Sequence, residues 1–371
     1  MTSNGLTPLG YRIAFASLQG MGIDLARKLL DVVGSEEQFF AMSEKELRDL
    51  THGRSKIYRD DYRREVLQHA MQEEGFVREH GIGATYFTDT AYPHRLSEAP
   101  DAPAMIYTLG HCDLESKHVI SVVGTRHATQ YGIRFCDTFI GELAQRLPDL
   151  VVVSGLAYGI DIAAHRAALK HGVPTVAVLP RGLNHIYPAA HRNDAIAIAK
   201  NGGMLLTDYT SQDAVQKSNF LARNRIVAAL SDCTVIVESA GAGGALVTAS
   251  LAMSYNRDVM AVPGRCSDEF STGCNKLIAT NKAALITSAD DLLAAMRWES
   301  ATPPAQQLEL FPSLTKEEQA VVDVIRDHGE IHLNTLADTL QQPVYKLMSV
   351  LVELDCKRVI TTLPGCRYAI L

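Results

Sequence analysis

The chain lacks the features that mark exported, metal-binding or membrane proteins. It has one tryptophan, and its seven cysteines are scattered with no C-x-x-C pair, so neither a zinc site nor a disulfide framework is predicted. The first ten residues have no basic segment followed by an apolar run. No apolar stretch reaches the ~20 residues of a membrane span. We therefore expect a cytoplasmic protein with reduced thiols and no contact with a membrane.

Positive charge is also scarce. The 371 residues include 35 Lys and Arg against 42 Asp and Glu, which gives a net charge of −7. This balance argues against nucleic-acid binding through a uniformly basic surface, so any such site has to be local. A hydrophobic content of 47% and a charged content of 21% are typical of a globular protein. The length allows two or three domains.

Composition and periodicity divide the chain into four segments. Residues 1–80 are predicted to form a helical domain that resembles a SAM or helix-hairpin-helix unit. Residues 81–298 are predicted to form a Rossmann-like domain. A Pro- and Gln-bearing linker follows at 299–312. Three helices and a terminal hairpin then predict a winged helix over 313–371.

A regular alternation of strands and helices begins at residue 118. The preceding residues, 81–117, are irregular and are predicted to be an extended connector. The alternation predicts an α/β fold with a doubly wound, mostly parallel sheet. Ligands of such sheets bind beyond the carboxyl ends of the strands, so we expect the candidate site there. The expected strands are 119–123, 150–153, 175–179, 204–207, 234–237 and 259–262.

The densest basic cluster surrounds one aromatic residue, Phe220. Lys217, Arg223 and Arg225 lie near it at the start of a predicted helix, with Asn219 as the expected N-cap. Helix N-termini attract anions, which adds to the pull of the cations. Beside these cations, Phe220 fits either a core contact or a stacking platform for an unpaired base. This stretch alone leaves both interpretations open.

Glycine turns follow most of the predicted strands. They occur at residues 124, 155, 159, 182 and 241–244, together with Arg126 and Arg181. A glycine lets the backbone approach an anion closely, and each following helix directs its N-terminus to the same edge of the sheet. The recurrence of these turns beside arginines predicts an extended phosphate-binding surface.

Signals for catalysis and cofactors are weak. No G-x-G-x-x-G follows the first strand and no Walker A loop is present, so we expect no dinucleotide or other cofactor. Asp161, His165 and Glu238 are candidate catalytic residues. For all three we favour a structural role: helix capping, a surface pair or hydrogen bonding to a glycine loop. The rival function is a nucleotide phosphoribohydrolase, because Glu238 and Gly241 to Gly244 partly resemble the glutamate and glycine-rich loop of such enzymes.

Several motifs occur in the order found in one bacterial family. V-G-T-R at 123–126, S-G-L-A-Y-G-I-D at 154–161, Phe220 with R-N-R at 223–225, and the segments 238–249 and 261–264 resemble the DNA-processing protein A family (DprA, also called Smf). The resemblance covers roughly residues 85–300. It implies a non-enzymatic protein that binds single-stranded DNA, forms a homodimer through its Rossmann-like domain, and helps load the RecA recombinase in natural transformation.

The same resemblance implies roles for individual residues. Lys217 would contact a phosphate and Phe220 a base, Arg126 would touch the strand, and the glycine turns would supply backbone amides. Two departures from the family pattern stand out: Leu221 replaces a frequent proline, and G-G-A at 243–245 replaces a usual S-G-S. The residues expected to bind DNA are Gly124, Thr125, Arg126, Ser154, Gly155, Gly159, Lys217, Asn219, Phe220, Arg223, Asn224, Arg225, Gly243 and Gly244.

Three further predictions concern partners. A helix over 273–279 with Leu277 on its apolar edge would lie in the dimer interface, or alternatively cover the sheet within one subunit. The segment 313–371 has a net charge of −2, and Lys346 is the only cation in its third helix, so we expect protein contacts or tuning of DNA binding rather than duplex reading. Q-L-E-L-F at Gln307–Phe311 resembles the peptide that docks on the bacterial sliding clamp; a latch onto the chain's own sheet is the alternative.

Overall fold

The structure is a computed structural model that describes residues 6–214, 216–299, 314–357 and 359–370. The chain divides into two compact units, residues 1–301 and 302–371. Each unit has a hydrophobic core of its own.

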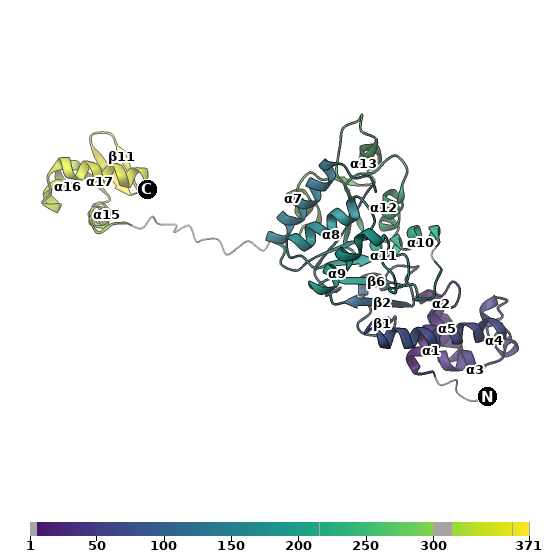
Figure 1. The fold of residues 1–371 in the computed structure, drawn as a ribbon. Coiled ribbons are helices and arrows are strands. Elements are labelled where there is room, and N and C mark those ends of the chain that lie inside the picture. The colour runs from purple at the N-terminus through teal and green to yellow at the C-terminus, as the bar shows by residue number, and fades with distance from the viewer. Residues whose placement is uncertain (1–5, 215, 300–313, 358, 371) are drawn as a thin grey trace. The chain divides into compact units, whose positions relative to one another are not determined.

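Helices form the N-terminal part of the first unit (Figure 1). Aromatic side chains fill the space between them, and the rings of Phe15 and Phe39 meet edge to face at 5.2 Å. A short 3-10 helix, Lys56–Tyr58, precedes the longest of these helices. The helices are α1 (Pro8–Ala16), α2 (Ile23–Val33), α3 (Glu36–Ala41), α4 (Glu44–Thr51) and α5 (Asp60–Glu79).

A nine-stranded sheet forms the centre of the first unit. Seven strands are parallel, in the order β6-β5-β4-β3-β7-β8-β9, and β2 and β1 extend the β6 edge in antiparallel orientation. The doubly wound, mostly parallel sheet is therefore confirmed. The strands are β1 (Gly83–Tyr86), β2 (Met105–Gly110), β3 (His118–Val123), β4 (Leu150–Ser154), β5 (Thr175–Val178), β6 (Met204–Thr207), β7 (Cys233–Ile236), β8 (Asp258–Ala261) and β9 (Ala284–Leu285).

The predicted irregular connector over 81–117 is wrong, because two of the strands lie within it. Gly83 pairs with Thr108, and Tyr107 pairs with Thr207 of β6. Long-range pairing supplies the backbone hydrogen bonds of these two strands. The turns and the short helix α6 (His94–Ser97) that separate them interrupt any period in the sequence.

Helices cover both faces of the sheet. In β3, Ile120 and Val122 pack with α7, α8 and α14, whereas Val119 and Val123 share a core with α11 and α12. Successive residues of a strand point to opposite faces, so a strand buried on both sides is apolar throughout. The helices are α7 (Gln130–Arg146), α8 (Ile160–Lys170), α9 (Arg192–Lys200), α10 (Lys217–Ala222), α11 (Asn224–Ala229), α12 (Gly244–Ser254), α13 (Thr272–Ala279) and α14 (Ala289–Met296).

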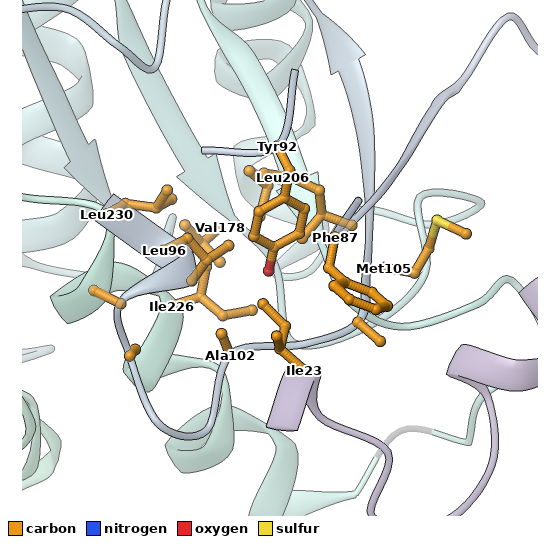
Figure 2. Close-up of a cluster of buried hydrophobic side chains, with 14 of the residues drawn as sticks. Ile23, Phe87, Tyr92, Leu96, Ala102, Met105, Val178, Leu206, Ile226 and Leu230 are labelled. Atoms are coloured by element: carbon orange, nitrogen blue, oxygen red, sulfur yellow. The ribbon is translucent and has the colours of Figure 1, made fainter. Parts of the chain in front are cut away.

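The core of the sheet continues into the N-terminal helices (Figure 2). Ile23 at the start of α2 and Phe87 after β1 lie in one cluster with Leu206 of β6 and Ile226 of α11. The N-terminal helices therefore support α11, the helix that directly follows α10 and its Phe220.

Helix α13 covers the sheet within the same subunit. Leu277 is 7% exposed and belongs to the main core, and the helix packs on β8. The second of the two predictions for this helix, that it covers the sheet within one subunit, therefore holds for Leu277. The buried Leu277 side chain is not free to form a dimer contact.

The second unit combines three helices with a three-stranded antiparallel sheet, in the order β10-β12-β11. The expected helices and hairpin are present. β10 was missed because three residues are too few for a visible period. The winged-helix assignment stays a prediction. The elements are α15 (Lys316–His328), β10 (Glu330–His332), α16 (Leu333–Leu340), α17 (Val344–Cys356), β11 (Ile360–Leu363) and β12 (Arg367–Ile370).

Two absences hold for the described ranges. No helix in them combines the length and the apolar character that a membrane crossing requires. Nor do these ranges contain a group of three or more His, Cys, Asp or Glu side chains placed to hold a metal ion.

Candidate nucleic-acid interface

A groove of about 600 Å³ lies beyond the carboxyl ends of β3 and β7. The strand order reverses between these two strands, and ligands of doubly wound sheets bind at such a point. Helices α10 and α11 and the amino end of α12 border the groove. It is lined by Val123, Gly124, Thr125, Arg126, His127, Ala157, Asp161, Tyr187, Lys217, Phe220, Leu221, Arg223, Asn224, Ser239, Ala240, Ala242, Gly243, Gly244, Ala245, Thr248 and Phe270.

Helix α10 presents a cation and an aromatic ring to the groove. Lys217 is exposed and forms no ion pair within the described part of the chain. The ring of Phe220, one turn later, meets the edge of Tyr187 with 5.2 Å between ring centres. The guanidinium of Arg126 lies 5.5 Å from the centre of the Phe220 ring. Three separate loops and helices thus bring two cations and two aromatic rings together.

The N-terminus of α12 adds backbone donors to the same groove. Gly243 is the N-cap and Gly244 the first residue, and no side chain among the described residues caps the helix. Both glycines are exposed, and a Cβ at Gly243 would meet nothing nearer than Ser239 Oγ at 3.9 Å. Asn224 Nδ2 donates to the Gly244 carbonyl at 3.4 Å, which ties α11 to this turn. Open backbone N–H groups and the helix dipole make this an anion site.

Arg223, predicted to bind the strand, forms part of the groove floor and is almost fully buried. Its side chain is 3% exposed, and Nη1 donates to the carbonyl oxygens of Gly155, at 2.6 Å, and Val178. Burial lowers the pKa of Arg223 to about 10, so it remains charged at neutral pH. A side chain at Gly155 would collide with this guanidinium. Arg223 therefore fixes the ends of β4 and β5, and its guanidinium is not free for a phosphate.

Asp161 is the acidic neighbour of Arg223. Burial raises the pKa of Asp161, while the charge of Arg223 and hydrogen bonding from the backbone at Ala157 and Gly155 oppose that rise. Opposite charges in the floor offset each other, so the attraction for phosphates comes from the exposed cations.

Ser154 and Asn219 hold the backbone in place instead of reaching the groove. Ser154 is fully buried, and its hydroxyl donates to the Val122 carbonyl at 2.6 Å. Asn219 Nδ2 donates to the Ala214 carbonyl at 3.2 Å. The predicted N-cap role of Asn219 is wrong because α10 begins earlier, with Gln216 as its N-cap.

Arg225 and Arg181 also lie outside the groove lining. Arg225 forms an ion pair with Asp208 and donates to the Asp101 carbonyl at 2.8 Å. Its guanidinium is therefore bound to partners outside the groove. The predicted extended rim is therefore shorter than the glycine and arginine pattern indicated.

The glycines at 124 and 159 serve close packing. The Ile160 N–H donates to the Thr125 carbonyl at 3.1 Å, and a side chain at Gly159, where φ is +79°, would overlap that same carbonyl. A side chain at Gly124 would strike Ile160. This packing presses the loop after β3 against α8 and leaves Arg126 exposed at the groove.

The groove residues absent from the predicted site include four with large side chains, His127, Tyr187, Leu221 and Phe270. The rings of His127 and Phe270 stack at 6.0 Å with 25° between their planes. Tyr187 follows β5, and Phe270 lies in a short 3-10 helix, Glu269–Ser271, that follows β8, so both lie at the carboxyl edge of the sheet. That position was the one available signal, since neither residue belongs to a recognisable motif.

The candidate catalytic residues are held in the interior. Glu238 is 4% exposed and accepts from the Thr129 hydroxyl at 2.6 Å and its N–H at 2.9 Å. His165 is fully buried, with Nδ1 at 2.7 Å from Thr175 Oγ1, and burial lowers its pKa to about 3. These contacts, with those of Asp161, favour structural roles over catalysis. The predicted surface pair is wrong, because Asp161 and His165 are both buried.

The comparisons with known proteins agree on one family. Residues 83–297 match the family described as DNA recombination-mediator protein A. The chain is 40% identical over 206 residues to the DNA processing protein DprA of Streptococcus pneumoniae, covering 56% of this chain and 71% of the relative. It is 31% identical over 278 residues to the Escherichia coli protein Smf, covering 74% of each.

Two solved structures share the fold. The X-ray structure of DNA processing protein A from S. pneumoniae superposes with a TM-score of 0.64 at 32% identity, covering 78% of this chain and 98% of that one. The Helicobacter pylori DNA processing protein A, described for its unique single-stranded DNA binding mode, superposes with a TM-score of 0.52 at 30% identity, covering 58% and 95%. The chain therefore belongs to the DNA recombination-mediator protein A family.

Proposed function

We propose that the groove beyond β3 and β7 binds single-stranded DNA and that the protein acts in recombination during natural transformation. One observation carries the proposal: Lys217, Arg126 and the ring of Phe220 line one groove with the N-terminus of α12, which no described side chain caps. Cations and free amides bind phosphates, and an aromatic ring stacks with an unpaired base. The single-stranded DNA binding described for the H. pylori relative supports the same ligand.

Salt titration of binding to a single strand and to the matching duplex tests this. The single strand should bind more tightly, because paired bases cannot reach Phe220. Lys217→Ala should weaken binding and reduce the slope of log affinity against log salt by about 0.7, the contribution of one phosphate contact. Lys45→Ala, which removes an equally exposed cation from α4, is the control. Equal affinity for duplex and single strand would contradict the proposal.

The protein has no catalytic role in this proposal. The interior hydrogen bonds of Glu238 and His165 support it, because both groups would have to leave buried partners before acting on a substrate. Incubation with nucleoside monophosphates, followed by chromatography of free bases, should detect no released base. Base release abolished by Glu238→Gln would favour the phosphoribohydrolase instead.

We further propose that the protein is a homodimer and that it delivers the strand to the RecA recombinase. With Leu277 in the core, the exposed edge strand β9 is the better dimer surface, and Leu285 there is 51% exposed. An unpaired strand edge is a template for pairing with another chain. Leu285→Asp should halve the mass in light scattering and slow RecA filament growth on coated DNA. A parent that is monomeric at micromolar concentration would contradict the dimer.

The cytoplasm is the compartment that this function requires. Cys112, Cys136, Cys233 and Cys274 are buried free thiols, and Cys266 and Cys366 are exposed ones, which supports a reducing environment. Quantification of the protein in cytoplasmic and periplasmic fractions would test the assignment.

The clamp-binding prediction at Gln307–Phe311 lies outside the described residues. We keep it as a proposal from the sequence alone, with the sliding clamp as a further partner. A synthetic peptide of residues 303–313 should bind purified clamp, and a peptide with Leu310→Ala and Phe311→Ala should not. Absence of binding by the first peptide at high micromolar concentration would leave the latch interpretation.

A further inference from the structure

A second cleft, of about 470 Å³, runs along the contact between α7 and α8, which lie side by side in Figure 1. Its floor is apolar, formed by Ile133 of α7 and by Ile162, Ala163 and Ala167 of α8. Arg126 and His127 line both this cleft and the groove described above. The two depressions therefore share one border, and a chain molecule could pass from one to the other across Arg126.

Cations surround this apolar floor. The lining contains four of them, Arg126, Arg134, Arg166 and Lys170, against a single carboxylate, Asp137. Arg134 is exposed and makes no ion pair with any residue that the structure describes. The excess of positive charge is notable in a protein whose net charge is −7, and it favours a polyanion as the occupant.

Lys170 and Arg166 are held by ion pairs, and only the Lys170 pair is exposed on both of its side chains. Lys170 Nζ lies 2.7 Å from Asp137, and Arg166 Nε lies 2.9 Å from Asp194. The side chains of Lys170 and Asp137 are 61% and 42% exposed, and a pair of this kind is worth no more than ~1 kcal/mol. A phosphate can replace the Asp137 carboxylate at Lys170 at small cost. Arg166 is held more firmly, because it donates two hydrogen bonds to Asp194, which is 17% exposed.

We propose that the α7–α8 cleft binds the continuation of the DNA strand that leaves the Phe220 groove. This inference rests on the proposed function and extends it to the path of the strand. An apolar floor bordered by Arg134 of α7 and by Arg166 and Lys170 of α8 suits bases that face inward and phosphates that face outward. Helix α8 has 11 residues, and the cleft along it is about 16 Å long, room for at most about five stacked nucleotides at ~3.4 Å each.

The test compares two strand lengths. One oligothymidylate of about six nucleotides fills the groove alone, and one of about twelve reaches the cleft as well. The parent should bind the longer strand more tightly and with steeper salt dependence. The double variant Arg134→Ala, Lys170→Ala should keep its affinity for the short strand. For the long strand it should lose roughly tenfold in affinity and about 1.4 in salt slope, at ~0.7 for each lost phosphate contact.

A matched variant separates position from net charge. Lys45→Ala, Arg64→Ala removes two exposed cations from α4 and α5 and should leave binding of both strands unchanged. The single variant Arg134→Glu repeats the comparison of the two strand lengths. Arg134 forms no ion pair with the described residues, so this change leaves the Lys170–Asp137 pair in place. Equal losses on both lengths, or no loss on the long strand, would overturn the cleft assignment. Failure of the parent to bind either strand would overturn the proposed function itself.

Discussion

Lys217 and Arg223 carry the same charge six residues apart, but the protein uses them differently. Lys217 is exposed at the groove, whereas Arg223 donates hydrogen bonds to two buried carbonyls beside Asp161. Removal of a buried charged partner leaves polar groups unsatisfied and costs ~3 kcal/mol or more. Arg223→Met should therefore lower the free energy of unfolding by about 3 kcal/mol in urea titrations, and Lys217→Ala by less than ~0.5 kcal/mol. Equal stability of the two variants would contradict these roles.

The ring of Phe220 should contribute by stacking. Phe220→Ala is expected to weaken single-strand binding by about 1–3 kcal/mol, the usual loss for one stacked base. Phe220→Tyr keeps a π-face and should bind nearly as well as the parent. Fluorescence anisotropy with a labelled oligonucleotide measures both. Equal affinity of the alanine variant and the parent would assign the ring to packing against Tyr187.

His165 should make stability depend on pH. Burial lowers its pKa to about 3, with the Arg223 charge acting in the same direction, while in the unfolded chain a histidine titrates near 6.5. Between these values the unfolded chain binds a proton that the folded chain does not. Stability from this residue is thus complete above pH ~6.5 and falls by up to ~1.4 kcal/mol per pH unit below it.

The corresponding measurement is urea unfolding at pH 7 and pH 5 for the parent and for His165→Asn. The variant is less stable at pH 7, since it alters a buried hydrogen bond to Thr175, but it should lose less stability between the two pH values. The same loss in both proteins would exclude His165 as the source.

The sequence identified residues that line the groove, but it did not show which arginines are held by partners elsewhere in the protein. Arg126, Lys217 and Phe220 meet in the groove as expected. The partners of Arg225 include the backbone of residue 101, and those of Arg223 include the carbonyl of residue 155. Such partners are distant in the chain, so no local pattern distinguishes a free arginine from one held in the interior.

Among the elements, α12 offers a test in which stability and affinity change in opposite directions. Gly243 has an extended backbone, with φ 167° and ψ 171°, that any residue adopts. Gly243→Asp should cap the helix and stabilise the fold by a few tenths of a kcal/mol. Its carboxylate would also occupy the anion site and repel phosphates, so single-strand affinity should fall. Gly243→Ser, a neutral cap, should be equally stable and retain affinity, as measured by thermal melting and anisotropy. Tighter DNA binding by the aspartate variant would exclude α12 from the site.

Six of the seven parallel strands could be predicted because they are apolar on both faces and alternate with helices. The seventh, β9, has only two residues, and both are exposed. β1, β2 and β10 could not, for a common reason. Each is a short antiparallel strand whose identity depends on pairing with a distant segment, as in the register of Gly83 with Thr108 and of Ile331 with Tyr368. Hydrophobic period carries little information in the four residues of β1 and the three of β10. β2 has six residues, but they do not alternate between apolar and polar.

For the whole molecule, the second unit should be dispensable for single-strand binding. Residues 313–371 have a net charge of −2, and Lys346 is the only cation on α17. The exposed surface of that helix includes Tyr345, Met348 and Val352, which suits contact with protein better than with phosphate. Deletion of residues 313–371 should change single-strand affinity less than twofold in anisotropy titrations. A collapse of affinity would make this unit a primary DNA-binding element.

The cluster shared by α2, the segment after β1 and α11 determines which fragments of the protein can fold on their own. Ile23, Phe87 and Ile226 lie in one buried apolar cluster (Figure 2). Heat should therefore unfold the first unit in one cooperative step, and the second unit should unfold in a separate step. A fragment starting at residue 81 would expose this surface and self-associate. A lineage could therefore lose the N-terminal helices only after polar substitutions in the segment 87–105 and on α11.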